Sequence, residues 1–408
     1  MTDHLGPALE GTSPGTSPGV TAPAGFRASG VTAGLKASGR PDLAIVVNDG
    51  PRHAGAAVFT TNRVVGAPVV WSRQVVADGV VSAVVLNSGG ANVSTGPEGF
   101  LDAHLTAECV ATALGVSAGD VVVCSTGLIG ERLPRETLLA GVDLAAAALT
   151  PDAGLDAATA IMTTDTVAKT AHVTVETPDG TFTVGGMAKG AGMLAPAMAT
   201  MLCVVTTDAD VEAPVLDAAL RAATAETFDR VDSDGCMSTS DTVTLLASGA
   251  SGVTPAADVL TDAVRRVCAS LARQLVADAE GASHDIAVHV VGATTPEAAV
   301  AVARAVTRSN LFKAAMFGND PNWGRVLAQA GTVPEEVAPF DPEAIDVAIN
   351  GVLVCKAARP HADRGEVDLA SAREVHVTVD LHAGDAAATV WTNDLTHDYV
   401  HENSAYST

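Results

Sequence analysis

The sequence predicts an α+β fold, a layered sandwich in which helices cover mixed or antiparallel sheets. Apolar runs typical of strands alternate irregularly with helical patterns, whereas a doubly wound parallel fold alternates strand and helix regularly. A Pro178-Asp179-Gly180 turn between two alternating runs predicts a hairpin. The run Met201–Val205 is apolar throughout, as expected of a strand buried on both faces. With 408 residues, 48% of them hydrophobic, the chain can form two domains or one large layered unit.

The first half begins with a predicted flexible tail, residues 1–19, in which Thr-Ser-Pro-Gly occurs twice. Ordered sequence begins near Val20, and apolar spacing then defines the elements. We predict strands at Leu43–Val47, Ala56–Phe59, Val80–Leu86 and Asp120–Cys124, helices at Leu101–Leu114 and Leu138–Leu149, and hairpin strands at His172–Glu176 and Thr181–Val184.

The second half contains the clearest helices. Ala256–Leu275 carries one apolar stripe, with Thr254 as the expected N-cap and Gly281 at the expected C-terminal cap. Phe317–Arg325 is dense in turn residues and predicts a loop. Further helices are predicted at Leu216–Phe228 and Pro296–Val306, and strands at Ile345–Cys355, Glu374–Leu381 and Ala387–Trp391.

The composition excludes several classes of partner. A formal net charge of −24 argues against nucleic acid and against an anionic membrane surface, which leaves small metabolites as the expected ligands. The six cysteines are dispersed and are expected to be small buried residues in a reducing compartment. The eleven histidines show no ligand spacing, so we expect no metal. The glycine-rich stretches do not follow the strand–helix pattern of a dinucleotide fingerprint, so we expect no bound cofactor. No membrane span or leader is expected, and we predict a cytoplasmic protein.

The stretch Gly185–Asp210 carries the strongest chemical signal. A glycine-rich turn and an Ala-Pro-Ala bend precede Thr200, which stands directly before the apolar run. In a continuous chain, such a threonine merely begins a strand. If the Ala199–Thr200 bond is cut, Thr200 becomes a nucleophile whose α-amine, with an ordinary pKa of about 7.7–8.0, serves as its base.

Two further features are open to more than one interpretation. Ser125-Thr126-Gly127 follows a predicted strand, where backbone N–H groups can face a ligand, although a plain β-turn explains it equally well. Lys189 lies eleven residues before Thr200, and a solvated surface position is the commonest fate of a lysine.

Ten motifs spread over the chain resemble the ornithine acetyltransferase family of arginine biosynthesis, a family of self-cleaving enzymes with an N-terminal threonine nucleophile and a DmpA-like fold. A set of ordered motifs is far more specific than any one of them. They are Val20–Pro23, Gly39–Ala44, Val58–Asn62, Ser125–Gly127, Ile161–Thr166, Lys189–Pro196, Met198–Leu202, Thr206–Ala209, Glu280–Ala282 and Asp320–Arg325.

The resemblance implies self-cleavage into an α chain ending at Ala199, ordered over 20–199, and a β chain, 200–408. The two chains form one intertwined catalytic unit with a smaller C-terminal lobe, and two such protomers are expected to form a heterotetramer. The reaction implied is acetyl transfer from N2-acetylornithine to glutamate. Whether acetyl-CoA is also a co-substrate stays open, because the sequence gives no signal either way. The implied oxyanion donors are Thr126 and Gly127, and the implied substrate contacts are Thr163, Lys189, Thr200, Glu280, Asn403 and Thr408.

Two departures from the family pattern stand near these residues. Ala197 occupies a position where asparagine is common, and Ser283-His284 follows Glu280–Ala282 where Thr-Lys is frequent. Two other functions remain open at this point. An acyl-threonine enzyme can act as an amidase or peptidase by passing its acyl group to water, and an uncleaved relative can serve only to bind a metabolite.

Overall fold

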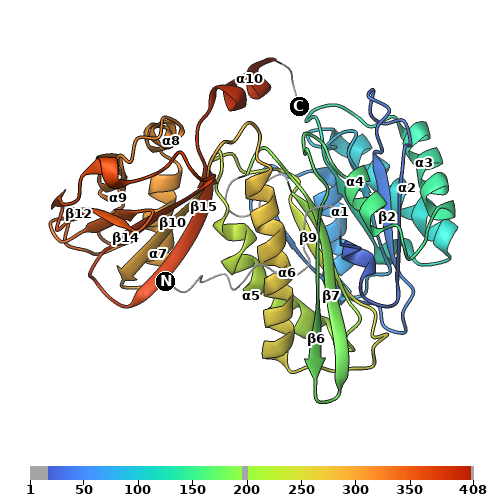
Figure 1. Ribbon diagram of the computed structural model, residues 1–408. Coiled ribbons are helices and arrows are strands. Elements are labelled where there is room, and N and C mark those ends of the chain that lie inside the picture. The colour runs from blue at the N-terminus through green and yellow to red at the C-terminus, as the bar shows by residue number, and fades with distance from the viewer. Residues whose placement is uncertain (1–16, 195–200, 406–408) are drawn as a thin grey trace.

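The computed structural model describes residues 17–194 and 201–405, which form three sheets with helices packed on them (Figure 1). This confirms the predicted α+β fold with mixed sheets. The first sheet has the order β1-β2-β4-β5, in which β4 and β5 are parallel and the other pairs antiparallel. Its strands are β1 Phe26–Val31, β2 Leu43–Asn48, β4 Ala83–Asn87 and β5 Val121–Ser125, and the helices of this region are α1 Ala67–Val75, α2 Gly96–Leu114, α3 Arg135–Ala147 and α4 Gly154–Ala160.

The second sheet has the order β3-β9-β8-β7-β6 and contains the predicted hairpin. β8 lies at its centre, parallel to β9 and antiparallel to β7, and all of its residues are buried, as the apolar run predicted. The strands are β3 Ala54–Phe59, β6 Lys169–Thr177, β7 Gly180–Lys189, β8 Leu202–Thr207 and β9 Thr242–Ala247, and the helices packed on them are α5 Ala213–Glu226 and α6 Ala257–Ala277.

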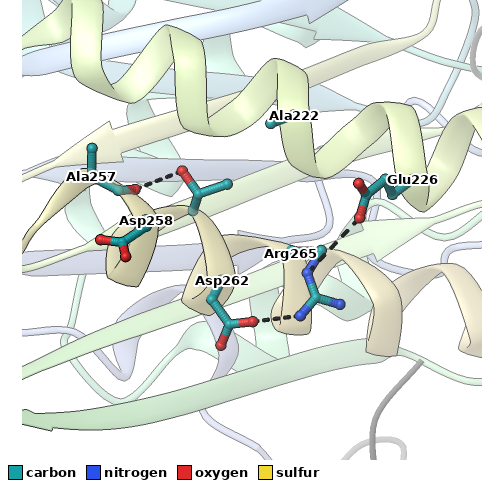
Figure 2. Close-up of a pocket in the computed structure, with 7 residues that line it drawn as sticks. Ala222, Glu226, Ala257, Asp258, Asp262 and Arg265 are labelled. Atoms are coloured by element: carbon teal, nitrogen blue, oxygen red, sulfur yellow. Dashed lines mark hydrogen bonds and ion pairs between the residues drawn. The ribbon is translucent and has the colours of Figure 1, made fainter. Parts of the chain in front are cut away.

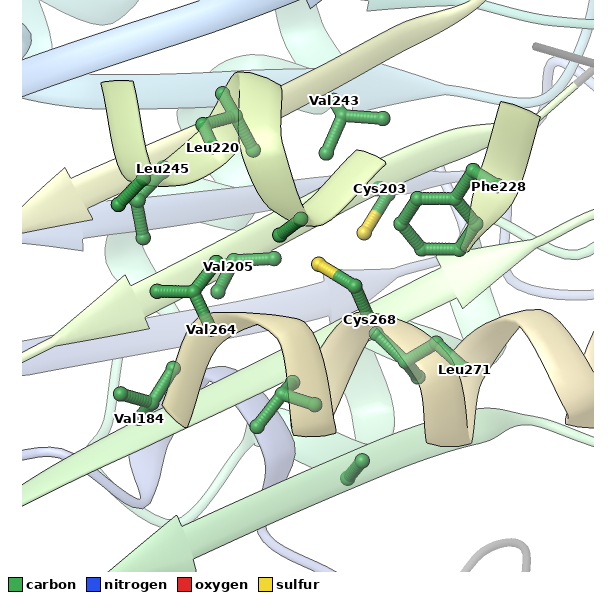
Figure 3. Packing of buried hydrophobic residues seen from close by; sticks show 14 of the residues in the cluster. Val184, Cys203, Val205, Leu220, Phe228, Val243, Leu245, Val264, Cys268 and Leu271 are labelled. Atoms are coloured by element: carbon green, nitrogen blue, oxygen red, sulfur yellow. The ribbon is translucent and has the colours of Figure 1, made fainter. Parts of the chain in front are cut away.

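These two sheets pack face to face between outer layers of helices. Val84 of β4 and Met187 of β7 belong to one buried cluster between the sheets. The other face of the second sheet packs on α5 and α6, where Leu220, Val264 and Cys268 meet the strands (Figure 3). The outer face of the first sheet packs in the same way on α2 and α3. The result is a four-layer helix–sheet–sheet–helix sandwich in which strand ends of the two sheets can approach one another.

The C-terminal part of the chain builds a third sheet around a core of its own (Figure 1). The sheet has the order β13-β12-β11-β14-β10-β15 and packs against α7, α8 and α9, and α10 follows its last strand. The elements are β10 Asp285–Ala293, α7 Pro296–Thr307, α8 Asn310–Phe317, α9 Trp323–Ala330, β11 Asp346–Ile349, β12 Val352–Lys356, β13 Arg359–Pro360, β14 Glu374–Asp380, β15 Ala386–Asn393 and α10 His397–Ala405. Short 3₁₀ turns occur at Gly19–Thr21, Val76–Asp78, Ala118–Asp120, Phe228–Arg230 and Arg364–Glu366.

Several predicted details were wrong. Ala256, not Thr254, is the N-cap of α6, and Asp278, not Gly281, is its C-cap. The predicted loop Phe317–Arg325 contains the start of α9, because the Asn322 side chain accepts a hydrogen bond from the Arg325 N–H and caps a helix there. The predicted strand Ile345–Cys355 is two strands joined by a turn, β11 and β12.

The ends of the chain and the cysteines also differ in part from expectation. Residues 1–16 of the predicted tail lie outside the described residues, but Ser17 is buried and its hydroxyl lies 2.7 Å from His172 Nδ1, so the tail ends before residue 19. The cysteines are unpaired, and four of them are buried. Cys236 is exposed and Cys109 is half-buried, so the expectation of six buried thiols was wrong for these two.

Candidate active site

Strand ends of the two facing sheets meet at Thr126 and Lys189. Thr126 directly follows β5 of the first sheet, and Lys189 is the last residue of β7 of the second. The Lys189 ammonium donates a hydrogen bond to Thr126 Oγ1 at 3.2 Å, and both side chains are buried. Because the hydroxyl oxygen accepts from a cation, its own proton is left to donate to another group. Lys189 is therefore no solvated surface lysine. Burial lowers its pKa, and the Asp165 carboxylate offsets part of this effect.

The turn after Thr126 depends on glycine. Gly127 has φ +127°, and a Cβ added to it would stand 2.9 Å from the backbone nitrogen of Gly90. Only glycine adopts this conformation readily at such a close approach. Over residues 17–194 and 201–405, the Gly127 N–H has no hydrogen-bond acceptor. An N–H without a partner on a half-buried residue, next to a donating hydroxyl, is the arrangement that an oxyanion requires.

Asp165 connects the segment of Thr163 to the segment of Lys189. Its carboxylate accepts the Thr163 N–H at 2.9 Å, the Gly190 N–H at 2.7 Å and the Lys169 ammonium at 2.6 Å. Lys169 is fully buried and also donates to Asp278 at 2.5 Å. Burial raises the pKa of Asp165, but Lys189 and Lys169 outweigh that effect and hold the pKa below its usual range. Asp165 and its buried lysine thus fix two of the predicted substrate-contact segments relative to each other.

Glu280 joins the same region through the glycine-rich turn that follows Lys189. Its backbone N–H donates to the Ala191 carbonyl at 2.9 Å, and a Cβ added to Gly192 would stand 2.6 Å from the Glu280 carboxylate. Asn403 of α10 donates through its side-chain amide to Glu280 Oε2 at 3.0 Å. The chain end therefore returns to the site, and Asn403 holds a carboxylate there instead of being a frayed terminal residue.

Replacing Gly192 by alanine is expected to displace the Glu280 carboxylate while leaving the fold intact. The clash falls on the far end of a flexible side chain, so the glutamate can move away at little cost. If Glu280 binds the substrate ammonium, KM for acetylornithine should rise about 10- to 100-fold, the effect of one charge-assisted hydrogen bond. Gly324→Ala is the matched control, since a Cβ there meets its nearest atom at an ordinary 3.5 Å. An unchanged KM in Gly192→Ala would remove Glu280 from the substrate contacts.

The start of β8 is anchored by a carboxylate that sequence reasoning missed. The Met201 N–H donates to Asp241 Oδ1 at 2.9 Å, and Asp241 is completely buried. Burial raises the pKa of Asp241 well above its usual value. Met201 follows Thr200 in the sequence, so Asp241 fixes the first described residue after the predicted nucleophile, directly before β8. Ala197, Ala199, Thr200 and Thr408 themselves lie outside the described residues.

The second departure from the family pattern has a structural role. His284 is buried, its Nδ1 lies 2.9 Å from Asp394 Oδ2, and the Ser283 N–H donates to Asp394 Oδ1 at 2.9 Å. These contacts tie the entry to β10 to the residue that follows β15. Ser283 and His284 therefore support the segment that leads to α10.

The structure thus brings together Thr126, Gly127, Thr163, Lys189, Glu280 and Asn403. Sequence reasoning missed Asp165, Lys169 and Asp241. The four-residue spacing of Asp165 and Lys169 indicates a pair only on a helix, whereas here Lys169 begins β6 and Asp165 precedes it. Within the described part of the chain, no group of histidine, cysteine, aspartate and glutamate side chains is arranged to hold a metal ion. Among the same residues, no helix has the length and apolar content of a membrane span.

A separate surface cavity of about 350 Å³ lies between α5 and α6 (Figure 2). Arg265 lies there beside Asp262 and is 4.0 Å from Glu226. None of the predicted site residues lines this cavity. Its charged groups pair with one another at the surface, so it presents no chemistry comparable to that of the strand ends.

Comparison with known proteins agrees with the motifs. The model of the ArgJ family matches residues 27–408. The arginine biosynthesis bifunctional protein ArgJ of Streptomyces coelicolor is 62% identical over 388 residues, which cover 95% of this chain and 99% of that protein. The protein of the same name from Thermobifida fusca is 60% identical over 389 residues, which cover 95% of this chain and 100% of that protein. A solved ornithine acetyltransferase from Mycobacterium tuberculosis, complexed with ornithine, is 55% identical, covers 45% of this chain and 96% of that chain, and has a TM-score of 0.42. The chain therefore belongs to the ArgJ family of bifunctional arginine biosynthesis proteins.

Proposed function

We propose that this protein is an acyltransferase of arginine biosynthesis that moves an acetyl group from N2-acetylornithine to glutamate through Thr200. The single observation that best supports this role is the buried Lys189–Thr126 contact beside the unpartnered Gly127 N–H. It provides two donors for a developing oxyanion, with a fixed positive charge behind one of them. Removal of one such donor typically costs about 100- to 1,000-fold in rate.

Maturation is the first reaction of Thr200. Its hydroxyl attacks the Ala199 carbonyl carbon, the peptide nitrogen leaves as the Thr200 amine, and water hydrolyses the ester that remains. The products are an α chain ending at Ala199 and a β chain beginning at Thr200. The new amine stands on the same residue as the hydroxyl and can take its proton directly or through one water.

Acetyl transfer uses the same oxygen a second time. Thr200 Oγ attacks the acetyl carbon of acetylornithine, the Thr200 amine takes the hydroxyl proton, and that proton passes to the departing α-amine of ornithine. Thr126 and Gly127 donate to the acetyl oxygen while it carries negative charge. The glutamate amine then attacks acetyl-Thr200 and leaves as N-acetylglutamate. In the bound donor, Glu280 faces the side-chain ammonium of ornithine, and Lys189 lies on the side of its α-carboxylate.

Intact-mass measurement tests this sequence of steps. We expect two fragments of roughly half size and, after incubation with acetylornithine, an added acetyl group confined to the fragment that begins at Thr200. Double-reciprocal plots of initial rate against acetylornithine, at several fixed glutamate concentrations, should be parallel, because ornithine leaves before glutamate reacts. Intersecting lines would contradict the mechanism. Acetate released without glutamate would favour an amidase, and a single unbroken chain would favour a metabolite-binding protein.

The bifunctional relatives support a second donor, and we propose that acetyl-CoA also charges Thr200. The same mass increase on incubation with acetyl-CoA tests this. We further propose that two cleaved protomers assemble as a heterotetramer in the cytoplasm, and the mass of the native particle tests the assembly.

A further inference from the structure

Lys36 stands on a loop whose conformation is fixed by one buried carboxylate. The loop connects β1 to β2, and the fully buried Asp42 side chain accepts the backbone N–H groups of four successive residues. These are Ala33 at 2.7 Å, Gly34 at 3.1 Å, Leu35 at 2.6 Å and Lys36 at 2.9 Å. Four hydrogen bonds to one carboxylate hold the loop rigidly, so the Lys36 side chain extends from a fixed backbone position.

This loop packs against the Gly89-Gly90 turn, which itself contacts the residue after Thr126. A Cβ added to Gly89 would stand 2.4 Å from Leu35 Cβ, and the neighbouring Gly90 is the residue that Gly127 approaches. On its other side, the Lys36 ammonium donates to the Met162 carbonyl at 2.6 Å, directly before Thr163. The Lys36 ammonium therefore lies beside the Thr163 segment, its loop reaches the Gly127 turn through Gly89 and Gly90, and Lys189 is close enough to influence its titration.

The charge of Lys36 is not neutralised by a bonded carboxylate. Within the described residues, its ammonium donates to two carbonyl oxygens, those of Pro41 and Met162. Lys169, the other lysine near Lys189, is bonded to both Asp165 and Asp278. The groups that act on Lys36 are Arg40, Lys189, Asp42 and Asp165, and both carboxylates are already bonded to other donors. Burial and the neighbouring cations lower the pKa of Lys36 to about 8, so an added anion at this point would be stabilised.

The two substrates of the proposed reaction differ in a way that requires such a cation. Both carry an α-carboxylate, but acetylornithine ends in an ammonium and glutamate in a carboxylate. A second carboxylate placed beside Glu280 would be repelled. We propose that Lys36 binds the side-chain carboxylate of glutamate and so selects the acetyl acceptor. This inference rests on the proposed function and adds a residue to it.

The test separates the two half-reactions in the cleaved wild type and in Lys36→Met. Acetylornithine first forms acetyl-Thr200, and the acetyl-enzyme is then mixed with glutamate, glutamine or ornithine while loss of the adduct is followed by mass. We expect Lys36→Met to form the adduct within about twofold of the wild-type rate. Its transfer to glutamate should slow about 10- to 100-fold, with transfer to ornithine and glutamine unchanged. Lys36→Arg should recover part of the loss.

Lys356→Met is the matched control, since that lysine is exposed on β12 of the third sheet and the charge change is the same. Equal slowing toward all three acceptors, or none, would overturn the role of Lys36. Failure of the wild type to form an adduct would instead overturn the proposed function.

A pH series on the wild type gives an independent readout that does not depend on the folding of a variant. Lys36 loses its proton as pH rises through about 8, so the preference for glutamate over glutamine should fall over that range. The ratio cancels the titration of Thr200, which is common to both acceptors. The acceptor amines shift the ratio upward and not downward, because the side-chain carboxylate raises the pKa of the glutamate amine. A ratio that stays constant from pH 7 to pH 9 would contradict the inference.

Discussion

Thr200→Ala is expected to remain a single chain of 408 residues and to show no measurable acetyl transfer. The substitution removes the oxygen that attacks the Ala199 carbonyl and the oxygen that carries the acetyl group. Both losses follow from one atom, so scission and activity should disappear together. Because the first step fails, the amine that serves as the base is never released. Denaturing electrophoresis and intact mass measure the scission, and an assay with acetylornithine and glutamate measures the transfer.

Thr200→Ser is the control for this result. Serine keeps the hydroxyl and, after cleavage, the α-amine, so both reactions should continue at reduced rates. A Thr200→Ala protein that is cleaved normally would require another nucleophile for maturation. A Thr200→Ala protein that transfers acetyl groups would require another acyl carrier, and either outcome would overturn the roles assigned here.

Local patterns predicted most of the elements, because each was specified by neighbouring residues. The Pro-Asp-Gly turn formed its hairpin, with Gly180 at φ +132°, and the continuous apolar run became the central strand β8. Asn322 caps α9, but the turn residues around it predict a loop, so the start of this helix was not predicted. The face-to-face packing of two sheets was beyond sequence reasoning, because it joins β4 to β7 across about a hundred residues of chain.

In the candidate site, too, local motifs predicted some residues and tertiary packing determined the rest. Thr126, Lys189 and Glu280 came from motifs, whereas their mutual contacts depend on tertiary packing. Asp165 is buried because Lys169 and the two backbone N–H groups meet it in the folded chain, and no local pattern predicts this. Lys36 belongs to no recognised pattern, since its position depends on Asp42 folding its loop back on itself.

Asp165→Asn is expected to destabilise the protein by about 3–5 kcal/mol at pH 7, the range measured when one partner of a buried ion pair is removed. Asparagine keeps the shape of aspartate but not its charge. Lys169 would then pair with Asp278 alone, and Lys189 would lose the carboxylate whose negative charge offsets the effect of burial. Activity should fall as well, because the Thr163 and Gly190 segments would no longer share a charged acceptor. Urea denaturation measures the stability, on a Thr200→Ala background so that one covalent chain unfolds.

The pH dependence distinguishes the loss of charge from a general packing defect. The pKa of Asp165 in the folded chain lies below its unfolded value of about 3.9, so its contribution is complete above that value and is lost as pH falls through the folded pKa. The difference between wild type and Asp165→Asn should therefore be constant from pH 7 to about pH 5 and shrink only in stronger acid. Asp49→Asn is the matched control. Asp49 pairs with Arg27 at the surface, where such a pair contributes about 0–1 kcal/mol. Equal losses in the two variants would show that the Asp165 ion pairs do not hold the site together.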